Sequence, residues 1–191
     1  MEAIHAFDPP ECPEPLPALP PGPARELLCE AMRALDEAEQ GTEPFLLAQA
    51  QAEVGRCYVA VGAFPAAQWH LQRALGWSSL LGSVDLRVDL LCELAELAVR
   101  EAELLKDQER PRRAHSARER ARDRCYQASA MATRATDPHW EVHVLLRVSE
   151  VLGRCGDHDD ALALQCRALH LLMQQDLPTL QLEWPGINAL Q

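Results

Sequence analysis

Several residue types and patterns are scarce in this sequence, and each scarcity narrows the fold class. Aromatic residues make up only 5% of the 191 residues, whereas alanine and leucine dominate the 48% that are hydrophobic. Asn-Gly and Asp-Gly turns and sustained alternation of β-branched residues, which are typical of β-sheet proteins, are missing. Small and aliphatic side chains instead favour closely packed helices. The sequence therefore predicts an all-α fold.

Long apolar runs and excess positive charge are also missing. No run of about 18 apolar residues occurs, so no transmembrane helix is expected. Residues 1–23 lack lysine, arginine and an apolar core segment, so a signal peptide is not expected either. The formal net charge of −11 argues against general binding to nucleic acids or anionic membranes. These absences predict a cytoplasmic protein.

Two further features of the composition bear on compartment and source. The seven cysteines are an odd number without a Cys-x-x-Cys spacing, which fits a reducing compartment. Lysine occurs once, at Lys106, and arginine carries nearly all the positive charge. This bias toward arginine, alanine and leucine suggests a GC-rich bacterial genome.

Catalytic signatures are absent as well. The sequence has no GxSxG, HExxH, P-loop or GxGxxG motif. Residues 155–160, Cys-Gly-Asp-His-Asp-Asp, include potential metal ligands, but a single Cys-x-x-His without a second pair does not complete a tetrahedral site. We interpret this segment as a turn in which Asp157 or Asp159 caps the next helix. The sequence thus predicts no catalytic residue, no metal and no cofactor.

The sequence does contain an internal repeat. Arg-Ala-Leu occurs at residues 33–35, 73–75 and 167–169, and Gln-Ala-Ser at 127–129 keeps the alanine, so that this alanine recurs at spacings of 40, 54 and 40. A fixed period of 20 to 50 residues is typical of a helical solenoid. The 14 extra residues of the middle unit fall within residues 102–116. They are expected to lengthen both helices of the middle hairpin by about two turns, with the turn near Pro111.

One unit of the repeat carries a family resemblance. The segment Val54-Gly55-x-x-Tyr58, followed by Gly62, Ala67, Leu71 and Ala74, resembles the tetratricopeptide repeat, although the family's tryptophan is Gln51 here. The resemblance implies a right-handed superhelix of about three helical hairpins with extra terminal helices. Small residues lie where paired helices cross in such a fold. The positions expected there are Ala67, Ala74, Ala161 and Ala168.

The distribution of prolines predicts that the chain has two parts. Residues 1–23 hold eight prolines and are expected to be a disordered tail, either a solvated leader or a tether that docks Ile4 and Phe7 in a groove. Residues 24–191 are expected to form a single helical-repeat domain. The predicted helices span 24–39, 44–61, 64–79, 84–108, 115–134, 139–154, 158–174 and a short piece from 178 that ends at Pro185.

The C-terminal piece has two alternative roles. Its apolar side chains are expected either to close the open end of the core or to form a homodimer contact, so the chain is a monomer or a homodimer. The residues concerned are Leu180, Leu182, Trp184, Ile187 and Leu190.

By resemblance, the first helix of each hairpin lines a concave groove that holds an extended peptide or a helix. Spacings of seven and four residues place polar side chains on one face of each of these helices. A solvated surface is the alternative reading of that face. The predicted groove residues are Gln49 and Arg56 in the first hairpin, Asp89, Glu96 and Arg100 in the second, and His143, Glu150 and Arg154 in the third.

The middle hairpin carries a local excess of positive charge. Residues 106–124 hold eight cations and four anions, which gives +4 in a chain that is otherwise −15. Such a run is commonly solvated or paired with itself. Arginine also binds carboxylate or phosphate with two parallel hydrogen bonds. Arg110, Arg112 and Arg113 are therefore a second predicted partner site, for an anionic partner.

These patterns together predict a non-enzymatic adaptor that binds a partner peptide or helix in its concave groove. A secretion or assembly chaperone is the alternative within the class of binding proteins, and it would need an apolar groove. A metal-dependent regulator or enzyme is the alternative from another class, and it would need a convergent cluster of histidine, cysteine and acidic side chains.

Overall fold

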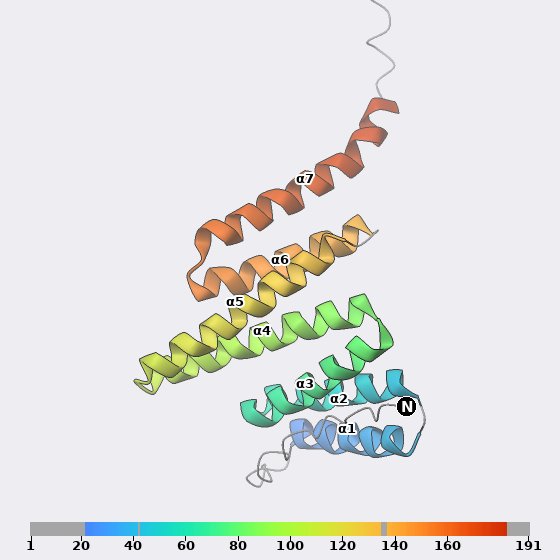
Figure 1. Cartoon of the computed structure of the whole chain (residues 1–191), viewed down its shortest axis with the longest axis vertical. Helices are drawn as coiled ribbons and strands as arrows, with labels where there is room; N and C mark the ends of the chain where they lie inside the picture. Colours follow the sequence, from blue (N-terminus) through green and yellow to red (C-terminus); the bar gives the residue numbers. More distant parts are fainter. Residues whose placement is uncertain (1–21, 42, 135–136, 183–191) are drawn as a thin grey trace, which may run out of the picture. The chain divides into compact units, whose positions relative to one another are not determined.

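The computed structural model describes residues 22–41, 43–134 and 137–182, with side chains up to Gln174. This part of the chain is all-α, as predicted, with seven helices and no strand (Figure 1). Among the described residues, no helix is both long and apolar enough to cross a membrane. The helices are α1 (Pro23–Gln40), α2 (Pro44–Ala60), α3 (Phe64–Leu81), α4 (Val84–Asp107), α5 (Pro111–Ala132), α6 (Pro138–Cys155) and α7 (His158–Leu182).

The chain divides into two compact units, and the boundary falls within α4. Unit 1 runs to Leu90 and unit 2 starts at Leu91. Each unit is described by itself below. The prediction of a single domain over 24–191 stays a prediction, and the predicted tail lies outside the described residues except for Gly22 and Pro23, which begin α1.

Prolines decide where most of the helices begin. Four helices start at a proline, whose missing N–H is not needed in the first turn and whose φ is already helical. The predicted start of α5 at residue 115 was wrong for this reason, because the helix begins at Pro111. The predicted break before Pro178 was also wrong, since α7 continues to Leu182. A proline inside a helix removes one hydrogen bond and crowds the carbonyl four residues earlier, so it weakens or kinks a helix without always ending it.

Three inter-helix turns share one hydrogen-bond pattern. After α2, the N–H of Ala63 donates to the carbonyl of Tyr58 at 3.0 Å and that of Gly62 to Val59 at 3.1 Å. The same pair of bonds closes α4 around Glu109 and α6 around Gly156. This is the Schellman motif, which places one residue in the left-handed region. The φ values there are 76° at Gly62, 55° at Glu109 and 94° at Gly156.

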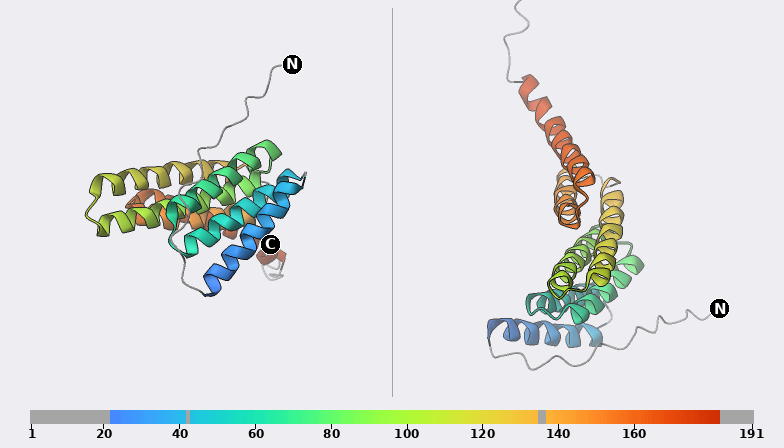
Figure 2. Two further views of the ribbon diagram at one scale, coloured as in Figure 1. Left: turned by 90° about the horizontal axis from the view of Figure 1, so that it is seen from below. Right: turned by 90° about the vertical axis from the view of Figure 1, so that its left-hand side faces the viewer.

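The position of Glu109 confirms the lengthening of the middle hairpin. Glu109 lies 47 residues after Gly62 and 47 before Gly156, seven more than the repeat of 40. Seven residues are about two helical turns. Accordingly α4 has 24 residues and α5 has 22, against 17 and 18 in α2 and α3. The added turns bury Ala102 and Leu105 against Ala114 and Ala117. Figure 2 shows the ribbons of α4 and α5 side by side in this part of unit 2.

In unit 1, small residues let α2 and α3 approach closely. A Cβ atom added to Gly55 would lie 2.7 Å from Cγ of Leu71, so only glycine fits at this crossing. Ala67 and Ala74 are completely buried, and Tyr58 is buried beside them. The burial of Ala67 and Ala74 is what their predicted role at the helix crossing requires.

A buried polar pair stands where the family resemblance expects a tryptophan. Gln51 is fully buried, and its Oε1 lies 2.7 Å from Nδ1 of His70. The rings of Tyr58 and Trp69 enclose His70 at centroid distances of 5.2 and 4.6 Å. Burial, assisted by the charge of Arg73, lowers the pKa of His70 to about 4. The imidazole is therefore neutral at neutral pH, with one nitrogen bonded to the amide of Gln51.

In unit 2, alanines of α5 and α7 again mark the helix crossings. Ala121 and Ala128 are fully buried, and Ala161 and Ala168 are 6% and 1% exposed. Ala168 of α7 packs against Val142 and Leu145 of α6. The crossing prediction is therefore confirmed at Ala168, and Ala161 is buried as that role requires. The side chains of Leu180, Leu182, Trp184, Ile187 and Leu190, which were expected to close the core, lie outside the described ones.

Candidate binding groove

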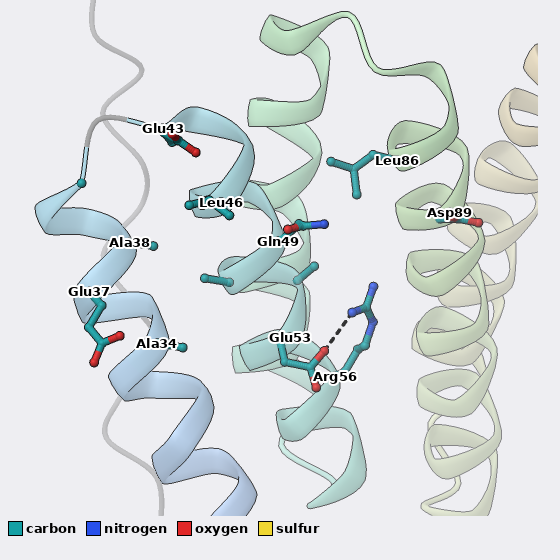
Figure 3. Close-up of a pocket in the computed structure, with 13 residues that line it drawn as sticks. Ala34, Glu37, Ala38, Glu43, Leu46, Gln49, Glu53, Arg56, Leu86 and Asp89 are labelled. Atoms are coloured by element: carbon teal, nitrogen blue, oxygen red, sulfur yellow. Dashed lines mark hydrogen bonds and ion pairs between the residues drawn. The ribbon is translucent and has the colours of Figure 1, made fainter.

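A groove of about 930 Å³ lies in unit 1 over the exposed face of α2. Figure 3 shows α1 on one side of this face and the start of α4 on the other. Three of the sequence-predicted groove residues line it, namely Gln49, Arg56 and Asp89. This cavity, called the α2 groove below, is completed by Ala34, Glu37, Ala38, Gly41, Glu43, Leu46, Ala50, Ala52, Glu53 and Leu86.

The local sequence explains why this face of α2 is open. Ala48 and Val54 are fully buried on the core side of α2. Gln49 and Arg56 are exposed on the groove side, two turns apart along the helix, and Ala52 lies between them as a buried part of the lining. Leu46, which is 49% exposed, joins them on that face and contributes an apolar patch.

Carboxylates dominate the charge of the α2 groove. Its lining holds four carboxylates, from Glu37, Glu43, Glu53 and Asp89, and a single guanidinium, from Arg56. Arg56 Nη1 donates to Oε2 of Glu53 at 2.9 Å (Figure 3). The side chain of Glu43 stands at the N-cap of α2 but makes no capping hydrogen bond among the described residues. The formal charge of the lining is therefore −3.

The groove residues predicted in unit 2 are arranged differently. Glu96 of α4 accepts from Arg147 of α6 at 2.8 Å, and Arg154 of α6 donates to Glu103 of α4 at 2.8 Å. The hydrogen bonds from Arg154 to Glu103 raise the pKa of that guanidinium. Two of the predicted contacts for a partner are thus used to join α4 to α6. Arg100, His143 and Glu150 are exposed.

The arginines of the middle hairpin fall into two groups. Arginines later in α5 bind other residues of unit 2. Arg120 pairs with Glu101 at 2.6 Å, and Arg124 donates to the carbonyl of Leu94 at 2.7 Å. Burial, together with the charge of Arg120, lowers the pKa of Arg124. Arg110, Arg112 and Arg113 are exposed at the start of α5 around a hollow of about 530 Å³. Their side chains make no hydrogen bond or ion pair to other described residues.

The Cys155–Asp160 segment is the turn that the sequence predicted. Arg122 of α5 donates to the carboxylate of Asp157 and, at 3.1 Å, to the carbonyl of Cys155. The backbone carbonyl of Asp157 accepts from the N–H of Ala161 at 3.0 Å, as expected at a helix start. Tyr126 donates to Asp160 at 2.5 Å, and this bond raises its pKa to about 12. Among the described residues, no three histidine, cysteine or acidic side chains are grouped to hold a metal.

Sequence reasoning missed part of the α2 groove. Glu53 lies one turn before Arg56, so its place on the same face could have been predicted from helical spacing. Glu43 stands directly before α2, whereas Glu37 belongs to α1, so the approach of Glu37 to α2 depends on tertiary packing. Ala34 was aligned with the buried Ala74, but it is exposed in the groove wall because no helix covers that side of α1 in the described part of unit 1.

Comparison with known proteins adds little to this geometry. No family model and no curated protein matches the chain. Among solved structures, the chain is similar to BtubC (BKLC) from P. vanneervenii, with 14% sequence identity and a TM-score of 0.28. That match covers 82% of this chain and 93% of the other. A TM-score at this level does not establish a shared fold.

Proposed function

We propose that the protein is a non-enzymatic adaptor built on a tetratricopeptide-like repeat, and that the α2 groove binds a segment of a partner protein. The observation that carries the proposal is the groove itself. A cavity of about 930 Å³ lies over α2, and it is lined by Gln49, Arg56 and Asp89, the side chains that the repeat pattern assigned to a binding face. A cytoplasmic location is part of the proposal.

Two features of the structure support the repeat. In three helix pairs the first helix ends in the same Schellman turn, at residues 62, 109 and 156. Buried alanines lie in each of these pairs. In unit 2, the first helices of successive hairpins are joined side by side by Arg147–Glu96 and Arg154–Glu103. This is the neighbour relation that a right-handed superhelix of about three hairpins requires.

The charge of the α2 groove favours an adaptor over a chaperone. A groove that shields apolar segments of secreted or unassembled proteins is expected to be lined mainly by apolar side chains. Here the lining is mixed, with four acidic residues and one arginine among Leu46, Leu86 and four alanines, so the apolar part of the groove still fits the chaperone alternative. The tip arginines remain a second predicted surface, for an anionic partner, because they are exposed and unpaired among the described residues.

The test is to fill the groove and compare what the protein captures. Gln49→Trp would place a bulky side chain on the exposed face of α2, and Gln72→Trp makes the same change on the exposed surface of α3, outside the groove. Affinity capture from the native organism, with mass spectrometry, should find a partner with wild type and Gln72→Trp that is lost with Gln49→Trp. Capture that is equal for all three proteins would place the binding site elsewhere.

A further inference from the structure

We propose that the occupant of the α2 groove is a basic, amphipathic segment of a partner protein, with lysine or arginine side chains on both sides of an apolar stripe. This inference rests on the proposed function and adds the chemistry of the partner.

The lining of the α2 groove has more negative than positive charge. Its four carboxylates come from three elements, with Glu37 on α1, Glu43 and Glu53 on α2 or at its start, and Asp89 on α4. Arg56 is the single cation of the lining, and it pairs with Glu53. A concave surface with apolar walls concentrates the field of such charges. The potential inside is therefore negative and selects cations.

Unit 2 differs from the α2 groove in how its carboxylates are paired. There the carboxylates on neighbouring helices are matched by arginines of the same unit, as in Arg147–Glu96, Arg154–Glu103 and Arg120–Glu101. In the α2 groove, Glu37 and Glu43 make no such pair with a described residue. These two carboxylates remain available to the cations of a partner.

The α2 groove also has apolar surface. Leu46 and Leu86 lie in it, and the small side chains of Ala34 and Ala38 leave room for close approach (Figure 3). A small polycation would satisfy the carboxylates and leave this apolar surface in water. A segment with both kinds of side chain satisfies both, because burial of the leucines adds to the charge pairing.

The chain's own tail is a poor occupant. Residues 1–21 contain four acidic residues and no lysine or arginine. Docking of Ile4 and Phe7 in the α2 groove would bring like charges together, so charge disfavours this alternative from the sequence analysis.

The experiment uses the full chain and a synthetic peptide probe. The probe is a labelled amphipathic helix of lysine, leucine and alanine, about 18 residues or five turns long, and its partner probe has glutamate in place of lysine. The groove variant is Glu37→Lys with Glu43→Lys. The matched control is Glu30→Lys with Glu39→Lys, which makes the same charge change on α1 outside the groove lining. Fluorescence anisotropy gives the affinities at low and high salt.

The expected result is that wild type and the control bind the basic probe, whereas the groove variant binds it about tenfold or more weakly. Added salt should weaken binding, and the acidic probe should not bind. An equal loss in the groove and control variants would overturn the proposal, because it would indicate net charge alone. Equal binding of the acidic probe would also overturn it.

Two other occupants are tested alongside. If spermine competes with the basic probe at equal or lower concentration, the groove takes a small polycation and the proposal fails. If wild type self-associates in low salt and Arg110→Glu with Arg112→Glu and Arg113→Glu abolishes this, the occupant is the tip of a second copy, and the proposal fails again.

The design keeps this inference separate from the proposed function. If Gln49→Trp blocks capture of a native partner while the basic probe does not bind, the adaptor function stands and the partner chemistry is wrong. If neither a native partner nor the basic probe depends on the groove, both proposals fail.

Discussion

Both units pack their helices closely, but the polar side chains between the helices differ. In unit 1, α2 and α3 approach closely at Gly55, Ala67 and Ala74 are buried, and the neutral pair Gln51 and His70 is buried as well. In unit 2, alanines again mark the crossings, but arginines also join neighbouring helices to carboxylates and carbonyls. Several carboxylates of unit 2 are therefore paired within the unit, whereas Glu37 and Glu43 of unit 1 line a groove without such a pair among the described residues.

This difference indicates which charged side chains are available to bind a partner. An ion pair between helices uses a charge to fix a structure, and that charge is then less available to a partner. Glu96 and Arg154 look like groove residues in the sequence, yet each has a partner in unit 2. The α2 groove keeps its excess of carboxylates because α1, α2 and the start of α4 contribute one arginine between them to its lining.

The largest effect is expected at the closest approach in unit 1. Gly55→Val would push a Cβ atom to within 3.3 Å of the backbone nitrogen of Leu71, and even closer to its side chain. Overpacking of this kind should cost about 3 kcal/mol of unfolding free energy, measured by urea denaturation. Gly76→Ala is the control, since an added Cβ meets nothing within 4 Å there. Alanine should stabilise that helix by about 0.5–1 kcal/mol. Equal outcomes at the two glycines would show that α2 and α3 are not in close contact.

The next effect tests the arginines of unit 2. Arg122→Met keeps most of the aliphatic stem but leaves Asp157 and the carbonyl of Cys155 without this donor. Stability should fall by about 1–2 kcal/mol in urea denaturation. Arg112→Met on the same helix should change it by less than about 0.5 kcal/mol, because Arg112 is exposed and has no described partner. A similar cost at both positions would remove the distinction between structural and tip arginines.

A smaller effect concerns pH and the neutral pair of unit 1. The pKa of His70 is about 4 in the folded protein, below its ordinary value of 6.5. The unfolded chain then binds more protons, so stability is fully present above about pH 6.5 and is lost as pH falls toward 4. Between pH 7 and 5.5 the loss should be about 1 kcal/mol, measured by urea denaturation at each pH. His70→Gln should remove this slope, whereas His143→Gln, at an exposed histidine, should keep it. An unchanged slope in His70→Gln would mean that other groups cause it.

The smallest effect concerns the hairpin turns. Gly62 of unit 1 and Glu109 of unit 2 hold the same left-handed position in matching Schellman motifs. A residue with a Cβ atom costs about 1 kcal/mol in this conformation. Glu109→Gly should therefore raise stability by about 0.5–1 kcal/mol, seen as a higher midpoint of thermal unfolding. Gly62→Ala should lower it by a similar amount. A lower midpoint for Glu109→Gly would show that the side chain of Glu109 stabilises the turn.

The sequence by itself determined most of the helix bounds and much of the buried face of α2, α3, α5 and α7. Alanine and glycine at fixed spacings identify the crossings, and prolines and left-handed turn residues delimit the helices, because these effects act within a few residues of the chain. The lengthening of the middle hairpin also followed from the repeat, since inserted turns keep the helical phase. The misjudged start of α5 and break in α7 came from prolines, which are compatible with a helix at its start and sometimes within it.

Only the tertiary structure decided which charged side chains meet. Glu53 and Arg56 are one turn apart, so helical spacing alone places them together. Arg147 and Glu96 are 51 residues apart, and Glu37 reaches the α2 groove from a different helix. Long side chains on neighbouring helices can pair with several residues of opposite charge, and the choice depends on the offset between those helices. That offset is set by side-chain packing across the whole interface, which no local pattern encodes.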